Sequence, residues 1–87
     1  MNRWRVYIIG WEPMAMPPLT ERQREVLIRD CDFMLTREGQ GVRLGEIVMV
    51  SHTNDPSGGP GLGTRMRCVG HELGGKVIVV EPIEGAS

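Results

Sequence analysis

Four residues of this 87-residue sequence carry side chains that zinc prefers: Cys31, His52, Cys68 and His71. Cys68 and His71 form one close Cys-x-x-His pair, whereas structural zinc sites usually combine two close pairs. Residues three apart in a strand also point to opposite faces of the sheet. The spacing therefore favours a small buried cysteine and a surface histidine, and we expect neither a bound metal nor a cofactor.

Other residues have the types needed for catalysis but lack the supporting pattern. Cys31 or Cys68 could act as a nucleophile if a histidine beside it served as the base. His52 and Asp55 could together carry out acid–base catalysis. No motif that orients such a pair accompanies them. The glycine-rich run at 58–65 has neither the lysine nor the following helix of a phosphate-binding loop. We leave enzymatic activity open and favour a protein without it.

Arginine supplies nine of the ten basic residues, yet the formal net charge is −1. A free-standing nucleic-acid-binding protein usually has a clear basic excess, so the composition does not indicate one. A local basic surface is the alternative. Side chains alternate along a strand, so Arg3 shares a face with Arg5, and Arg65 shares a face with Arg67. If the two strands are neighbours, these groups converge beside Tyr7, which could stack on a base. Otherwise they are charges that protect a sheet edge.

Large apolar side chains are concentrated near one strand end, in a proline-rich loop and in a glycine-rich loop. Tryptophan and methionine are enriched at the centres of protein interfaces. These side chains either cover the core or form a partner-binding surface, and both interpretations stay open. The candidate partner-binding residues are Trp4, Trp11, Met14, Met16 and Leu62.

The elements that position these residues follow from the order of apolar, proline and glycine residues. Arg5–Ile9 is predicted to be a strand that ends at Gly10, because the four residues after Arg5 are β-branched or aromatic. The prolines within Trp11–Leu19 favour an extended loop. Residues 20–23, Thr-Glu-Arg-Gln, are a capping box and predict the start of a helix. This helix runs either to Glu38 or to about Asp30.

We favour the shorter helix, because apolar and polar residues alternate through Cys31–Arg37, as in a strand. Ile47–Val50 predicts another strand that is apolar on both faces, which indicates either burial on both sides or a small closed barrel. Thr64–Leu73 and Lys76–Pro82 predict a hairpin, since the Gly-Gly between them is a strong turn signal.

These elements predict an α+β fold: a small, mostly antiparallel, partly closed β-barrel with one short helix. A four-stranded sheet with a helix on one face is the alternative. We expect one domain over residues 1–87, with a flexible Gly/Pro loop at 53–63 and a tail at 84–87. The loop either stays mobile or becomes ordered on a partner. No apolar run is long enough to span a membrane, and two cysteines fit a reduced, cytoplasmic protein.

The layout of residues 21–81 resembles the phage-associated branch of the ASCH family, which has a PUA-like barrel. The family's helix, its Phe-x-Leu strand, its Gly-Asp strand start, its Asp-Pro loop and its Gly-Arg strand have counterparts here. These counterparts are Glu21–Leu27, Phe33-Met34-Leu35, Leu44-Gly45-Glu46-Ile47-Val48, Asp55-Pro56 and Gly63–Val69. The resemblance implies the barrel fold and, through the family, RNA or nucleobase ligands and a phage or mobile-element origin.

The family's cleft motif, Gly-x-Lys-x-x-Glu-x-Arg, is missing. When the two patterns are aligned, the Gly, Lys, Glu and Arg positions of the motif are occupied here by Arg29, Cys31, Met34 and Thr36. Without the lysine and glutamate of the catalytic members, the resemblance implies fold more than activity. We therefore predict a small non-catalytic binding module that modulates or inhibits a host protein through protein contact. The alternatives are an RNA- or DNA-binding domain that uses its arginine faces and a small hydrolase acting on a modified nucleobase. The oligomeric state stays open.

Overall fold

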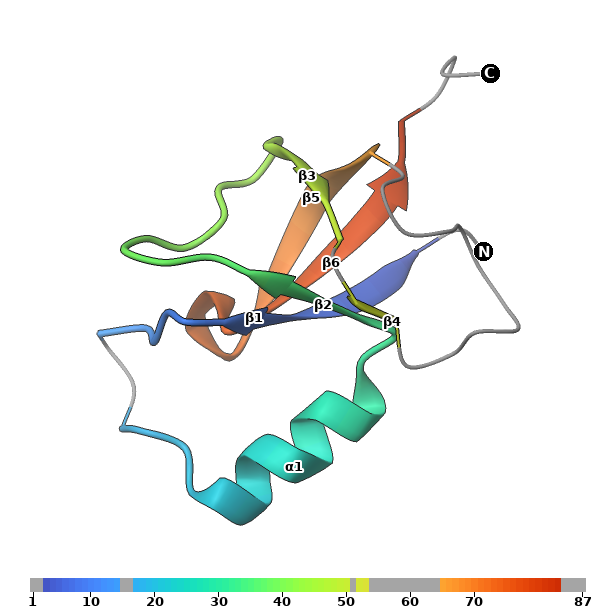
Figure 1. Cartoon of the computed structure of the whole chain (residues 1–87). Helices are drawn as coiled ribbons and strands as arrows, with labels where there is room; N and C mark the ends of the chain where they lie inside the picture. The colour runs from blue at the N-terminus through green and yellow to red at the C-terminus, as the bar shows by residue number, and fades with distance from the viewer. Residues whose placement is uncertain (1–2, 15–16, 51, 54–64, 84–87) are drawn as a thin grey trace.

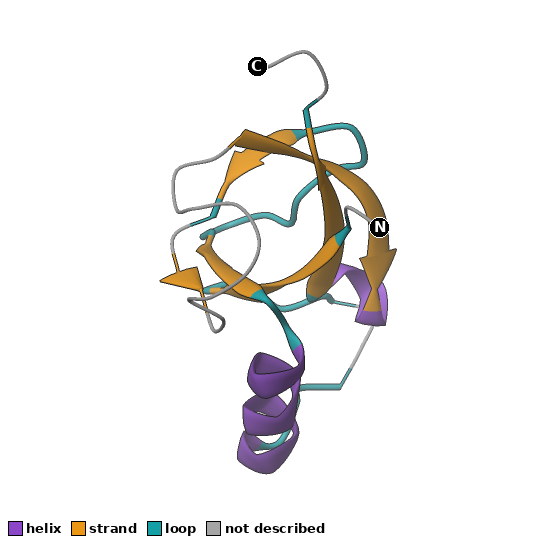
Figure 2. Ribbon diagram, turned by 90° about the vertical axis from the view of Figure 1, so that its right-hand side faces the viewer, coloured by secondary structure: helices purple, strands orange, loops and turns teal. Residues whose placement is uncertain are grey.

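The strands form a mixed sheet that curls into a partly closed barrel, with one α-helix outside it (Figures 1 and 2). The computed structural model describes residues 3–14, 17–50, 52–53 and 65–83. Its strands are β1 (Trp4–Ile9), β2 (Phe33–Thr36), β3 (Ile47–Met49), β4 (His52–Thr53), β5 (Arg65–Glu72) and β6 (Val77–Pro82). The helix α1 spans Glu21–Asp30, and a 3₁₀ turn, η1, spans Leu73–Gly75. The predicted fold class is confirmed.

The barrel closes because one stretch of chain changes its pairing partner. The strand order is β3-β5-β6-β1-β2-β4, in which β3 and β4 stand at opposite ends although they follow each other in the chain. The stretch 47–53 therefore pairs first with β5 and then with β2. The prediction of a loop from residue 53 onward is wrong at its start, because Thr53 pairs with Phe33 in this closure. The rest of that loop and the tail at 84–87 lie outside the described residues.

Among the described pairings, β1 with β2 is the parallel one. Parallel neighbours need a crossover connection, and the proline-rich loop and α1 provide it. The loop ends at the predicted capping box: the Thr20 hydroxyl accepts from the Gln23 amide at 3.1 Å, and the Gln23 side chain accepts from the Thr20 amide at 2.9 Å. The helix ends at Asp30, which confirms the shorter of the two predicted helices.

Side chains alternate between the barrel interior and its outer surface, as the pleat requires. The interior is filled by the apolar cluster Val6, Ile8, Phe33, Leu35, Val42, Val48, Val50, Met66, Cys68, Ile78 and Val80. Of the two interpretations of Ile47–Val50, the small closed barrel is the one that applies, and burial on both faces is not. Val48 and Val50 point inward, whereas Ile47 is 42% exposed and Met49 is 56% exposed on the outer surface.

A second, smaller cluster lies on the outside of the sheet, where α1 covers β1, β2 and β6. It consists of Tyr7, Cys31 and Val77, with Ile9, Leu27, Ile28 and Met34 packed against them. No residue of α1 itself is fully buried. The helix therefore rests on the barrel through a narrow apolar strip and leaves much of its surface exposed to solvent (Figure 2).

Candidate protein-binding surface

The two tryptophans close opposite ends of the barrel. Trp4 begins β1 and packs edge-on against Phe33, with ring centroids 6.3 Å apart. Trp11 follows the other end of β1, and its indole lies so close to Gly41 that an added Cβ there would be 2.8 Å from the ring. Both side chains are partly buried and pack against the interior cluster. Of the two interpretations left open by the sequence, covering the core is therefore the one that applies to Trp4 and Trp11.

The remaining candidate partner-binding residues divide into one that the structure describes and two that it does not. Met14 is fully exposed in the loop between β1 and α1. Met16 and Leu62 lie outside the described residues. The five candidates therefore do not form one continuous surface, because Trp4 and Trp11 lie at opposite ends of β1.

Lys76 is a buried anchor that sequence analysis missed. It is 2% exposed, and its ammonium group donates to the Trp11 carbonyl oxygen at 2.7 Å. The same group lies 3.1 Å from a carboxylate oxygen of Glu12 and 4.8 Å from the ring centroid of Tyr7. Glu12 also contacts Arg24 of α1 at 3.8 Å. The single lysine therefore fixes the loop after β1, and through that loop helps to hold the helix.

The arginine faces do not converge as the alternative hypothesis required, because β6 separates β1 from β5. Arg5 forms an ion pair with Glu72, with 2.7 Å between Nε and Oε1. Arg3 lies 3.6 Å from Glu81, which is also the cross-strand partner of Arg67. The expectation that Tyr7 stacks on a base is wrong, since its ring is buried beneath α1 and beside the lysine ammonium. The exposed members of this candidate set are Arg3, Arg65 and Arg67.

The two cysteines lie in different clusters, so they do not come together as two ligands of one zinc site. Cys68 belongs to the barrel interior, whereas Cys31 belongs to the cluster beneath α1. His71 donates from Nε2 to the Val42 carbonyl oxygen at 2.5 Å. Among the residues that the structure describes, no three potential metal ligands gather. The His52 side chain and Asp55 lie outside what is described.

Burial makes both thiols weak nucleophiles: it raises the pKa of Cys31 to about 11 and also raises the pKa of Cys68. We expect iodoacetamide at pH 8 to label the folded protein at least about 100-fold more slowly than the urea-unfolded protein, because the thiols react only when the fold opens. Mass spectrometry of timed samples measures both rates. Rapid labelling of one thiol in the folded state would contradict this and revive a cysteine nucleophile.

The position that resembles the family's Gly-Asp strand start has a structural use here. Gly45 adopts a φ of 85°, which glycine tolerates without strain. The Glu46 carboxylate accepts from the Arg43 amide at 3.0 Å and pairs with the guanidinium of Arg37. These contacts, led by the backbone hydrogen bond, lower the pKa of Glu46. The carboxylate thus holds the turn that leads into β3.

An apolar groove lies between the start of α1 and the η1 turn. We call it the α1 groove, and its apolar lining is Leu19, Val26, Leu27 and Leu73, with Thr20, Arg22 and Gln23 at its rim. Its volume of about 410 Å³ falls within the range of ~300–1,000 Å³ typical of ligand sites. Val26 is 49% exposed and Leu73 is 40% exposed. The groove therefore presents aliphatic surface to solvent.

Leu73 carries backbone strain in addition to this exposure. Its φ of 53° is the one positive value among the described residues other than glycine. The left-handed region costs an ordinary side chain roughly 1–2 kcal/mol, and asparagine or glycine would fit it better. Strained positions of this kind are frequent at binding sites. Leu73 thus combines a partly exposed aliphatic side chain with a left-handed backbone.

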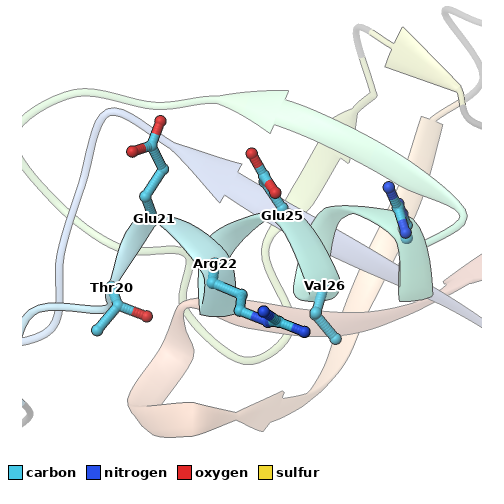
Figure 3. Close-up of a pocket in the computed structure, with 6 residues that line it drawn as sticks. Thr20, Glu21, Arg22, Glu25 and Val26 are labelled. Carbon is cyan, nitrogen blue, oxygen red and sulfur yellow. The ribbon is translucent and has the colours of Figure 1, made fainter.

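A shallow hollow continues the groove along α1 and is shown in Figure 3. Within it, Arg22 and Val26 point to one side of the helix, whereas Glu21 and Glu25 point to the other (Figure 3). The described lining of the α1 groove itself thus contains no acidic side chain, whereas Glu21 and Glu25 line the hollow that continues it. Sequence analysis did not select Leu19, Val26 or Leu73. The signals that could have found the groove are a valine amid charged helix positions and a leucine before Gly-Gly, and both are weak.

Comparison with known proteins returned no matching family model, no similar curated protein and no similar solved structure. In the part of the chain that the structure describes, no helix is long and apolar enough to cross a membrane.

Proposed function

We propose that this protein is a small non-catalytic binding module that contacts another protein through the α1 groove. The observation that carries the proposal is Leu73, which holds an aliphatic side chain at the groove from a strained backbone position. The helix above it presents Val26 to solvent. A host protein is the partner to test first, because the sequence resembles a phage-associated family.

Nucleic-acid binding and hydrolysis have less support. Two of the five residues proposed for nucleic-acid contact are used within the fold: Tyr7 is buried and Arg5 is paired with Glu72. A hydrolase would need a replacement for the family's missing lysine and glutamate. Cys31, which occupies one position of that motif, is a buried thiol with a raised pKa. Protein contact is therefore the function that the geometry supports best.

The replacement Leu73→Asn tests this proposal because it should separate binding from stability. Asparagine accepts the left-handed backbone, so we expect the melting temperature to stay unchanged or to rise by up to several degrees. The aliphatic side chain is lost, so we expect capture of the partner to fall by about tenfold or more. The measurement is affinity capture from nuclease-treated host lysate by tagged protein, quantified by mass spectrometry, together with thermal unfolding by circular dichroism.

The matched control is Leu44→Asn, which removes another exposed leucine at a distance from the groove. We expect this variant to retain the partner that the wild type captures. Equal capture by the wild type and the Leu73 variant would contradict the groove as the contact. A mixed set of proteins that disappears with nuclease would contradict protein contact and favour nucleic-acid binding through Arg65 and Arg67.

A further inference from the structure

A stripe along α1 combines one aliphatic side chain with two basic ones. Arg22, Val26 and Arg29 are spaced by four and three residues, which places them on the same face of a helix. Val26 lines the α1 groove, Arg22 stands at its rim, and Arg29 borders the adjoining hollow. Both arginines are exposed. The groove therefore has one guanidinium group at its rim, and a second lies in the adjoining hollow, which Glu21 and Glu25 also line.

These two arginines differ from several others in the same structure. Arg3, Arg5, Arg24 and Arg37 each form an ion pair with a carboxylate. Neither Arg22 nor Arg29 has such a pair with any carboxylate of the described residues. Glu25 has a helix spacing that suits a pair with Arg29, yet the two do not form one. The stripe thus retains positive charge that a partner can neutralise.

We infer that the α1 groove binds a short acidic segment of the partner, with an aliphatic side chain at its centre and a carboxylate on each side. This inference rests on the proposed function and adds the chemistry of the partner. Seven residues of helix separate the arginines by about 10 Å along the axis. In an extended segment Glu-x-Leu-x-Glu, alternate residues share a face and the two glutamates lie about 13 Å apart. Long arginine side chains accommodate that difference.

The contact has two parts with different physical behaviour. The leucine of the segment fills the aliphatic groove, which supplies affinity by removing apolar surface from water. The carboxylates meet exposed guanidinium groups, whose pairing is modest and is screened by salt. The charges therefore decide which segments bind more than how tightly they bind.

The test is a titration of ¹⁵N-labelled protein with three capped peptides, Gly-Glu-Thr-Leu-Thr-Glu-Gly, the same peptide with lysines for glutamates, and the same peptide with glycine for leucine. We expect the first to shift the amide signals of Arg22, Val26 and Leu73. The other two should bind at least about fivefold more weakly. In the double variant Arg22→Glu/Arg29→Glu, we expect the lysine peptide to bind better than the acidic one. Arg43→Glu, an exposed arginine at a distance, is the control.

The outcomes separate this inference from the proposed function. Equal binding of the acidic and lysine peptides, or shifts confined to Arg65 and Arg67, would overturn the inference. If the partner is captured in a Leu73-dependent way and the double charge variant captures it equally well, the groove is the contact but its ligand is not acidic. Loss of capture in both Leu73→Asn and the double charge variant, with Arg43→Glu unaffected, supports both proposals.

Discussion

Replacing Trp11 by alanine is expected to lower the free energy of unfolding by about 3 kcal/mol, near the low end for buried tryptophan because this ring is only partly buried. A domain of 87 residues has roughly 4–13 kcal/mol in total, so the loss is a large fraction of its stability. The cause is that the indole closes one end of the barrel against the interior cluster. Urea unfolding followed by circular dichroism measures the change.

A double-mutant cycle with Gly41 makes this prediction specific. Gly41→Ala places a Cβ 2.8 Å from the Trp11 ring, a distance that requires the ring or the backbone to move. Overpacking of this kind typically costs about 1–3 kcal/mol. We expect that cost in the wild-type background and little or none when Trp11 is already alanine. The coupling free energy then reports the contact directly.

Met14 provides the control, because it lies in the same loop and is fully exposed. We expect Met14→Ala to change the free energy of unfolding by less than about 0.5 kcal/mol. If the Trp11→Ala variant had the same free energy of unfolding as the wild type, the indole would contribute nothing to closing the barrel. Equal costs of Gly41→Ala in both backgrounds would contradict the contact with Trp11.

Replacing Lys76 by methionine is expected to lower the free energy of unfolding by about 2 kcal/mol. The methionine keeps an apolar stem of similar length but leaves the Trp11 carbonyl without its donor, and an unsatisfied buried polar group costs about 1–3 kcal/mol. The contact with the Tyr7 ring, worth roughly 1 kcal/mol, is also lost. Methionine also avoids the cost of burying a charged ammonium group, and this gain offsets part of the two losses. Urea unfolding at pH 7 is the measurement.

Glu12→Gln separates the buried part of this anchor from its exposed part. The Glu12 side chain is 45% exposed, so its ion pair with Lys76 is screened by solvent. We expect the glutamine variant to lose less than about 1 kcal/mol, clearly less than Lys76→Met. The reverse ranking would show that the ion pair, and not the hydrogen bond to the Trp11 carbonyl, is the main contribution of Lys76.

Local patterns predicted the elements of this protein well. The capping box at 20–23 specified the start of α1, since its two hydrogen bonds involve residues only three apart. The Gly-Gly pair predicted the β5–β6 hairpin, because Gly74 and Gly75 both adopt positive φ there. The two-residue spacing of Phe33 and Leu35, flanked by polar Asp32 and Thr36, favoured β2 over a longer helix. Each of these signals depends on neighbours along the chain, which the sequence displays directly.

Pairing between distant strands was the part that no local pattern specified. Convergence of Arg3, Arg5, Arg65 and Arg67 required their two strands to be neighbours, but β6 lies between them. The exposure of Ile47 and Met49 likewise depends on where α1 lies, since a cover on the outer face of β3 was needed to bury them. A strand's composition is the same whichever neighbours it acquires, so apolar residues on both faces do not reveal which face is covered.

Turn, cap and alternation signals were sufficient to favour an α+β barrel with one short helix, because these signals act within a few residues. The roles of individual side chains, in contrast, depend on how distant segments pack together. Lys76 became a buried anchor because the Trp11 carbonyl, 65 residues away in sequence, lies within hydrogen-bonding distance. Leu73 became part of a groove because Leu19 and Val26 of a distant segment lie opposite it. Such roles arise from contacts between remote segments, and these exist only once the chain has folded.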